Sequence, residues 1–121
     1  MKEILETIKQ ALPRIHGWCC LEKATKFVEL ILEHKPELCV EIGVFGGSSL
    51  IPQAMALEQN KKGKLIGIDP WANDSALEEM ISEENRQWWA KLDLEDIYKH
   101  CQDNIAIYGL KNYCSLLRAK S

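Results

Sequence analysis

An apolar run that breaks into a glycine turn constrains the fold more than any other feature of this chain. Residues 38–42 carry a single acid, Glu41, and three glycines follow within residues 43–47 before two serines. A short apolar run bounded by turn residues is typical of a strand buried on both faces of a parallel sheet. Glycines directly after it allow a tight bend into a helix. The stretch therefore predicts a strand, a glycine turn and a helix.

Further strands and helices alternate along the chain, each bounded by proline, glycine or a capping residue. The predicted elements are helices at 2–12 and 21–34, a strand at 38–42, a helix from 47 or 48 to 59, a strand at 64–69, helices at about 76–90 and from a cap at Asp93 to a stop at Gly109, and a strand at 113–118. This order is typical of a parallel α/β sheet. We predict a Rossmann-like three-layer sheet, truncated to about three strands, with two N-terminal helices.

The composition excludes several classes of partner and site. The 121 residues carry a net charge of −3, which offers no basic surface to nucleic acid. No apolar run approaches the roughly 20 residues that cross a bilayer, and the N-terminus lacks the apolar core of a signal peptide. We therefore expect a cytoplasmic protein. The five cysteines have no C-x-x-C spacing, and His16, His34 and His100 are scattered, so no metal site is expected.

The glycine turn lies where open parallel sheets bind ligands, beyond the carboxyl ends of the strands. Gly43, Gly46 and Gly47 would let a ligand approach the main chain without meeting a Cβ. Ser48 and Ser49 would begin a helix whose N-terminus favours negative charge. Because a tight turn alone would need the same glycines, the turn by itself is a weak sign of a ligand site.

Two acids at neighbouring strand ends strengthen this prediction. Glu41 precedes Gly43 by two residues, and Asp69 ends the second strand. The glycine spacing is not G-x-G-x-x-G, so a site for a pyrophosphate is not favoured. Glu41 suits a ligand with a positive group, whereas Asp69 could accept hydrogen bonds from both hydroxyls of a ribose. A nucleoside that carries an amino acid and no phosphate would satisfy these features.

The same residues resemble a known family. The sequence VEIGVFGGSSL is similar to the first motif of class I S-adenosylmethionine-dependent methyltransferases, and KLIGIDPW to their second. Together they are closest to the small-molecule O-methyltransferase-like branch. YGLKNYCSLLRAKS resembles the family's next strand, which leads to the adenine pocket. The similarity covers residues 38–121 and implies a helical segment at 1–36 followed by the N-terminal half of a Rossmann domain at 37–121.

The resemblance implies a role for each matching residue, with no catalytic residue assigned. Glu41 would hold the ammonium group of S-adenosylmethionine, directly or through water, and Asp69 would bind the ribose hydroxyls. The other implied roles are the floor beneath the cofactor for Gly43, Gly46 and Gly47, a cap on its carboxylate for Ser48 and Ser49, the adenine side for Pro70 and Trp71, and the adenine region for Ser121. Trp18 is expected to pack the N-terminal helices instead.

The resemblance also implies a missing part. The family's sheet has seven strands, of which this chain would supply three, so the half that binds the methyl acceptor would be absent. The first strand would then be an edge, covered by a second copy in a homodimer or by the N-terminal helices. The favoured function is methyl transfer to a small-molecule oxygen or nitrogen. The alternatives are a non-catalytic remnant or assembly module, or a protein that binds NAD or a sugar nucleotide.

Overall fold

A computed structural model describes residues 2–72 and 93–120, which form a parallel sheet and helices. In chain order the elements are α1 (Lys2–Ala11), the 3₁₀-helix η1 (Leu12–Arg14), α2 (Leu21–His34), β1 (Leu38–Ile42), α3 (Leu50–Asn60), β2 (Lys64–Asp69), α6 (Leu94–Ile107) and β3 (Cys114–Arg118). The predicted α/β Rossmann-like class is confirmed. The helix predicted at about 76–90 and Ser121 lie outside the described residues.

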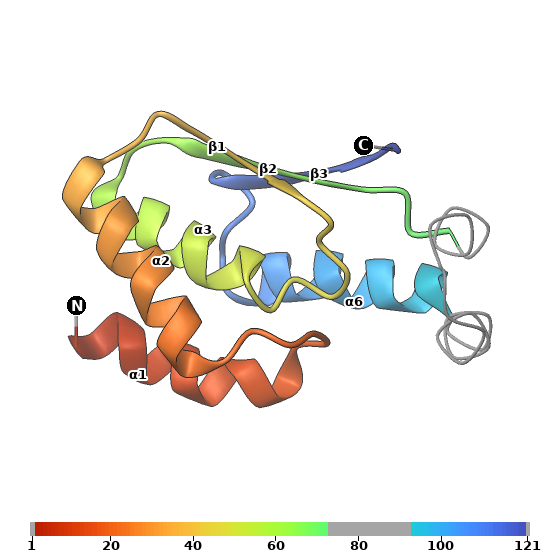
Figure 1. Cartoon of the computed structure of the whole chain (residues 1–121), viewed down its shortest axis with the longest axis horizontal. Coiled ribbons are helices and arrows are strands. Elements are labelled where there is room, and N and C mark those ends of the chain that lie inside the picture. Colours follow the sequence, from red (N-terminus) through yellow and green to blue (C-terminus); the bar gives the residue numbers. More distant parts are fainter. Residues whose placement is uncertain (1, 73–92, 121) are drawn as a thin grey trace.

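The sheet has the strand order β1-β2-β3, with both neighbouring pairs parallel. Glu41 on β1 lies opposite Gly67 on β2, and Asp69 at the end of β2 lies opposite Arg118 on β3. Because the strands are parallel, their carboxyl ends share one edge of the sheet (Figure 1). The glycine turn therefore lies next to Asp69.

The described helices all lie beneath one face of the sheet (Figure 1). On that face Gly67 allows close packing, because a Cβ there would lie 2.8 Å from a methyl carbon of Val44 and 2.9 Å from one of Leu50. On the opposite face the side chains of Leu38, Val40 and Ile42 are 61%, 53% and 64% exposed. The prediction that β1 is buried on both faces is therefore wrong, since no described element covers its outer face.

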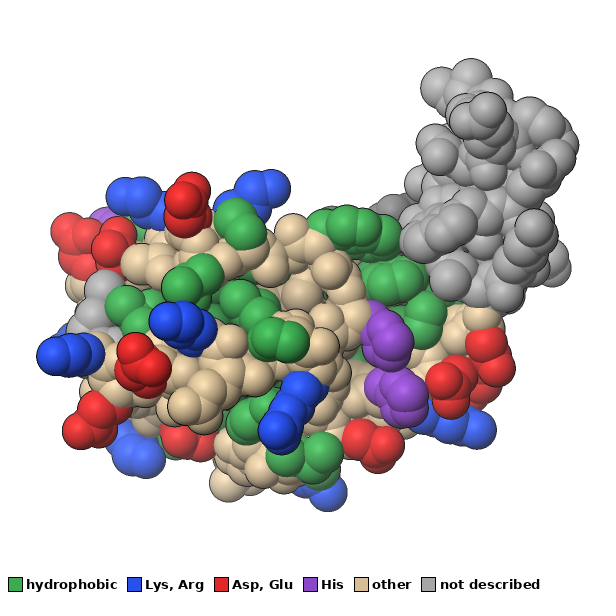
Figure 2. All heavy atoms as spheres, turned by 90° about the horizontal axis from the view of Figure 1, so that it is seen from below, with side chains coloured by type: hydrophobic (Ala, Val, Ile, Leu, Met, Phe, Trp, Pro, Cys, Tyr) green, Lys and Arg blue, Asp and Glu red, His purple; other side chains and the backbone are tan. Residues whose placement is uncertain are grey.

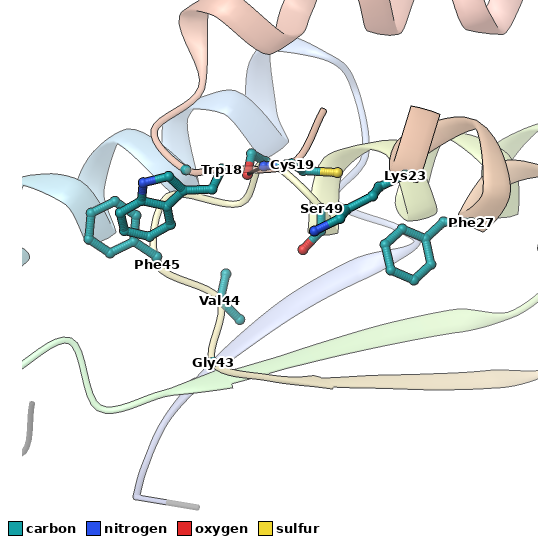
Figure 3. A pocket seen from close by; sticks show the side chains of 10 residues that line it. Trp18, Cys19, Lys23, Phe27, Gly43, Val44, Phe45 and Ser49 are labelled. Carbon is teal, nitrogen blue, oxygen red and sulfur yellow. Dashed lines mark hydrogen bonds between the residues drawn. The ribbon is translucent and has the colours of Figure 1, made fainter. Parts of the chain in front are cut away.

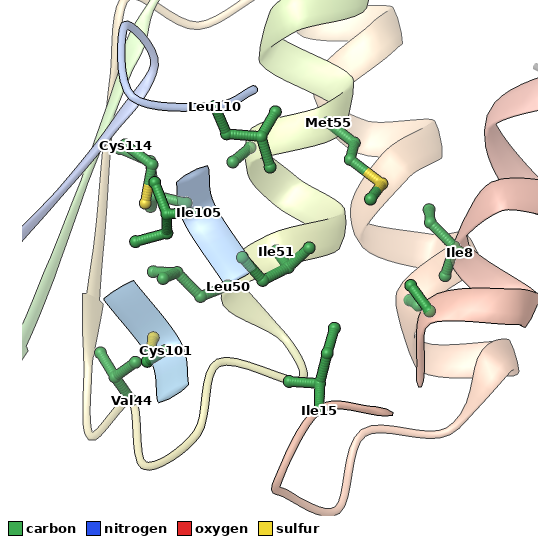
Figure 4. Packing of buried hydrophobic residues seen from close by; sticks show 14 of the residues in the cluster. Ile8, Ile15, Val44, Leu50, Ile51, Met55, Cys101, Ile105, Leu110 and Cys114 are labelled. Atoms are coloured by element: carbon green, nitrogen blue, oxygen red, sulfur yellow. The ribbon is translucent and has the colours of Figure 1, made fainter. Parts of the chain in front are cut away.

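Helix α3 is the centre of the hydrophobic core. All residues from 50 to 57 are buried, because the sheet lies on one side of this helix and α1 and α2 pack on the other. In Figure 4, Ile8 and Ile15 face α3 from the N-terminal segment, and Cys101 and Ile105 of α6 lie nearer the sheet. The core thus fixes the start of α3 and, with it, the glycine turn.

The ends of α6 follow the sequence signals that predicted them. The Asp93 carboxylate accepts a hydrogen bond from the backbone N–H of Asp96 at 3.0 Å, and Gly109 has a φ of +68° beyond the last turn. Seen from the helical side (Figure 2), acidic and basic side chains are interspersed around hydrophobic ones. Among the described residues, no helix has both the length and the apolar character that a membrane span needs.

Candidate functional site

Asp69 holds the glycine turn in place. Its Oδ2 accepts hydrogen bonds from the backbone N–H groups of Val44 at 2.9 Å and Phe45 at 3.0 Å, and its Oδ1 accepts one from Trp71 at 2.8 Å. Bonds from N–H groups to an ionised carboxylate are stronger than bonds between neutral groups. The side chain that ends β2 therefore fixes the backbone that leaves β1, and it brings two predicted site regions together.

The glycine turn and the segment after β2 each contain a backbone conformation that non-glycine residues rarely adopt. Phe45 has a φ of +55° and Trp71 a φ of +46°. The indole N–H of Trp71 donates to the carbonyl oxygen of Phe45 at 2.7 Å, so each strained residue is tied to the other. Such conformations persist only where the surroundings over-determine them, and they cluster at functional sites.

Trp71 is part of the protein interior. Its side chain is only 2% exposed and lies against Tyr98, with 4.7 Å between ring centroids. Arg118 donates to the Trp71 carbonyl oxygen at 3.3 Å and forms an ion pair with Glu95 at 2.8 Å. Pro70 is half-buried beside Trp71. Neither of these two residues, which were predicted to line the adenine side, borders the pocket described below.

Glu41 lies between the sheet and the start of α3, and its two carboxylate oxygens differ in hydrogen bonding. Its Oε1 accepts hydrogen bonds from the Ser49 hydroxyl at 2.6 Å and from the Gln53 amide at 3.0 Å. Its Oε2 is buried and has no hydrogen-bond partner among residues 2–72 and 93–120. Burial raises the pKa of Glu41, against the lowering effect of the two hydrogen bonds. A buried acceptor without a donor is costly, so this oxygen would be stabilised by a donor that the described residues do not supply.

A pocket of about 310 Å³ opens beside Ser49, whose hydroxyl donates to this carboxylate (Figure 3). Its lining residues are Gly17, Trp18, Cys19, Lys23, Phe27, Gly43, Val44, Phe45, Ser48 and Ser49. Ser49 links the pocket to Glu41, because it lines the one and donates to the other. Gly43 is open, with no atom within 4 Å of the place where a Cβ would lie. The volume is at the lower end of the range for small-molecule sites, about 300–1,000 Å³.

The other two glycines of the turn face protein. A Cβ on Gly46 would collide with the carbonyl oxygen of His16, and one on Gly47 would lie 2.9 Å from the Cys101 sulfur. The Ser48 hydroxyl is also engaged, since it accepts a hydrogen bond from the backbone N–H of Cys19 at 3.1 Å. Of the three glycines predicted to lie beneath a cofactor, Gly43 therefore borders the pocket, while Gly46 and Gly47 accommodate neighbouring segments.

Sequence reasoning missed the wall that the N-terminal segment contributes. Trp18 is 66% exposed and its ring lies 4.8 Å from that of Phe45, so the prediction that it packs the N-terminal helices is wrong. The reason is that the connector after η1 crosses the glycine turn instead of folding back onto α1. Lys23 and Phe27 extend this wall from α2. Their helical spacing was visible in the sequence, but nothing local indicated what their face of α2 would meet.

The thiols and metal-ligating groups form no further centre in the described part of the chain. The five cysteines are free, and no group of three histidine, cysteine or acidic side chains there could hold a metal ion. Burial raises the pKa of Cys101 and of Cys114 to about 12, so both thiols stay protonated near neutral pH. They pack as small apolar side chains.

Comparison with known proteins identifies one family. The family model described as a methyltransferase domain matches residues 40–118. The match begins within β1 and ends with the last residue of β3, so it includes Glu41, the glycine turn and Asp69. No curated protein matches the chain.

Proposed function

This chain belongs to the class I S-adenosylmethionine-dependent methyltransferase-like family, and from that premise we propose that it binds S-adenosylmethionine in the pocket beside the glycine turn. The buried, unpartnered Oε2 of Glu41 carries the proposal. An ammonium group is the donor that such an oxygen needs, because it supplies both a hydrogen bond and a compensating charge. The amino-acid end of S-adenosylmethionine carries that group, and a nucleotide such as NAD does not present one there.

The open side of the turn supports the same ligand. Gly43 leaves space where any other residue would place a side chain, so a ligand can lie against the main chain at the end of β1. Asp69 accepts three backbone hydrogen bonds, and a carboxylate has roughly four acceptor positions. We therefore propose that Asp69 accepts one ribose hydroxyl in addition to holding the turn. Pro70 and Trp71 do not border this pocket, so the proposal gives them no contact with the adenine.

The proposed reaction is methyl transfer to an oxygen or nitrogen of a small molecule. Bound S-adenosylmethionine supplies an electrophilic methyl group, whose carbon bonds to a lone pair of the acceptor as its bond to sulfur breaks. The contribution of this chain is positioning. Glu41 would fix the amino-acid end and Asp69 the ribose, which together set the direction of the methyl group between them.

Isothermal titration with S-adenosylmethionine and S-adenosylhomocysteine tests the proposal. We expect both ligands to bind, and Glu41→Gln to weaken both by about tenfold or more, because a hydrogen bond to a charged group contributes about 1.5–3 kcal/mol. The control is Glu22→Gln, which alters an exposed acid on α2. Binding that Glu41→Gln leaves unchanged would contradict the proposed site. Tight binding of NAD alone would support a nucleotide-binding protein, and no binding of any ligand would support an assembly module.

We also propose that β1 pairs with β1 of a second copy. Within the described residues β1 has β2 as its one strand neighbour, and α1 and α2 pack against α3 beneath the sheet. An unpaired edge with exposed apolar side chains favours strand pairing. Sedimentation velocity should show a dimer that Val40→Lys dissociates. Leu117→Lys places the same charge on β3, at a similarly exposed position, and should leave the dimer intact. A monomeric wild-type protein would refute the pairing.

A further inference from the structure

Lys23 brings a positive charge to the pocket. It is in the first turn of α2, and its side chain reaches into the pocket toward Ser49 (Figure 3). Within the described part of the chain no hydrogen bond or ion pair occupies its ammonium group. Lys26 on the same helix differs, because it pairs with Glu29 at 3.5 Å and its side chain is 80% exposed. Lys23 is thus the lysine of α2 that is free to meet a ligand.

Lys23 lines the pocket, and Glu41 accepts a hydrogen bond from Ser49, which also lines it. Burial is the main cause that raises the pKa of Cys19, which lines the pocket; the Cys20 thiol and the Glu41 carboxylate raise it further, and the Lys23 ammonium lowers it. Ser49 provides the geometric connection, since it donates to Glu41 and lies where the Lys23 side chain points.

We propose that Lys23 and Glu41 form a two-pole clamp for an α-amino acid group, in which Lys23 binds the carboxylate and Glu41 Oε2 the ammonium. This inference rests on the proposed function and names which part of the ligand the site selects. Ser48 and Ser49, just before α3, also line the pocket, and the positive end of the helix dipole there would favour the carboxylate of the ligand. Lys23 is a specificity-determining residue, because it distinguishes a nucleoside with a complete amino acid from one with an amine alone.

The clamp predicts that loss of Lys23 weakens only ligands that carry a carboxylate. A variant that merely folds less well would weaken all ligands equally. S-adenosylhomocysteine carries both the carboxylate and the ammonium, whereas its decarboxylated analogue, S-adenosyl-3-thiopropylamine, carries only the ammonium. Lys23→Gln should weaken S-adenosylhomocysteine about tenfold or more, as expected for the loss of a charge-assisted hydrogen bond. The analogue should change by less than about twofold, because a single screened charge has little effect on it.

Isothermal titration of the full chain with both ligands measures these differences. Lys26→Gln is the matched control and should change neither affinity, and Lys23→Arg should retain most of the affinity for S-adenosylhomocysteine because it keeps the charge. Thermal unfolding verifies that each variant is folded. Equal affinities of wild type and Lys23→Gln for S-adenosylhomocysteine, or equal losses for both ligands, would overturn the clamp while leaving the proposed function standing. Binding of neither ligand by wild type would instead refute the proposed function and the clamp with it.

Discussion

Two carboxylates at the ends of neighbouring strands have opposite surroundings. Asp69 accepts three hydrogen bonds from backbone N–H groups of the turn and of its own segment. Glu41 accepts two, both from side chains and both on one oxygen, and its other oxygen is buried without a donor. The first acid is satisfied by the protein backbone, whereas the second keeps one buried oxygen without a donor among the described residues.

The difference follows from where each side chain points. Asp69 is the last residue of β2, so its carboxylate lies at the open edge of the sheet, where the turn's N–H groups have no strand partner. Glu41 lies one residue before the end of β1 and points toward the covered face, where α3 removes water. Residues of the same class therefore have different surroundings at the two strand ends: Asp69 holds the turn, and Glu41 keeps an unsatisfied oxygen, which is why we propose Glu41 for the ammonium group.

Removal of Asp69 should have the largest effect on stability. Asp69→Ala would leave the N–H groups of Val44, Phe45 and Trp71 without their acceptor, and we expect a loss of about 3 kcal/mol or more in the free energy of unfolding. Urea denaturation measures it, with Asp103→Ala on the exposed side of α6 as the control. A loss below about 1 kcal/mol would mean that water satisfies these donors, and that Asp69 is as free for a ligand as Glu41.

Substitutions of two glycines in the turn should likewise differ, one in its effect on stability and the other in its effect on ligand affinity. Gly46→Ala places a methyl group against the backbone of His16 and should cost about 2 kcal/mol of stability, as overpacking usually does. Gly43→Ala meets no atom, so its cost is the strain of a left-handed alanine, about 1 kcal/mol. Its methyl group would enter the pocket, however, and should reduce the affinity for S-adenosylhomocysteine more than Gly46→Ala does. Unfolding and titration of both variants give this comparison, and a reversed order in either measurement would contradict it.

The strands β1 and β2 and the helix α2 could be predicted residue by residue, because their signals are local, and β3 begins one residue later than predicted. The bounds 38–42, 64–69 and 21–34 agree with the structure, since proline, glycine or lysine-rich turns separate apolar runs of clear period. The outer face of β1 could not be predicted in this way. An apolar side chain indicates that a strand tends to be buried, but not which segment of a chain is available to cover it.

The site was only partly visible in the sequence. Glu41 and Asp69 could be placed at one edge because parallel strands align their carboxyl ends. The difference in hydrogen bonding between the two carboxylates could not be predicted, since it depends on backbone donors and on burial against α3. The wall formed by Trp18 and Lys23 depends on a connector that crosses the turn, a contact between segments more than twenty residues apart that no local pattern encodes.

The pH dependence of stability should show the smallest effect and should belong to Glu41. Because burial raises its pKa in the folded state above the ordinary value of 4.5, the folded protein favours the protonated acid. The contribution of Glu41 to stability is therefore fully present below that ordinary value and is lost as the pH rises through the raised one. Urea unfolding across this interval should show a decline in the free energy of unfolding that Glu41→Gln removes.

A bound ligand offers a second way to abolish this decline. An ammonium group on Oε2 stabilises the ionised carboxylate and lowers its pKa, so saturating S-adenosylhomocysteine should flatten the pH profile of wild type and leave that of Glu41→Gln unchanged in shape. Equal slopes for wild type and Glu41→Gln without ligand would mean that Oε2 already has a donor in solution. The two carboxylates would then be alike in being satisfied by the protein, and the contrast between them would disappear.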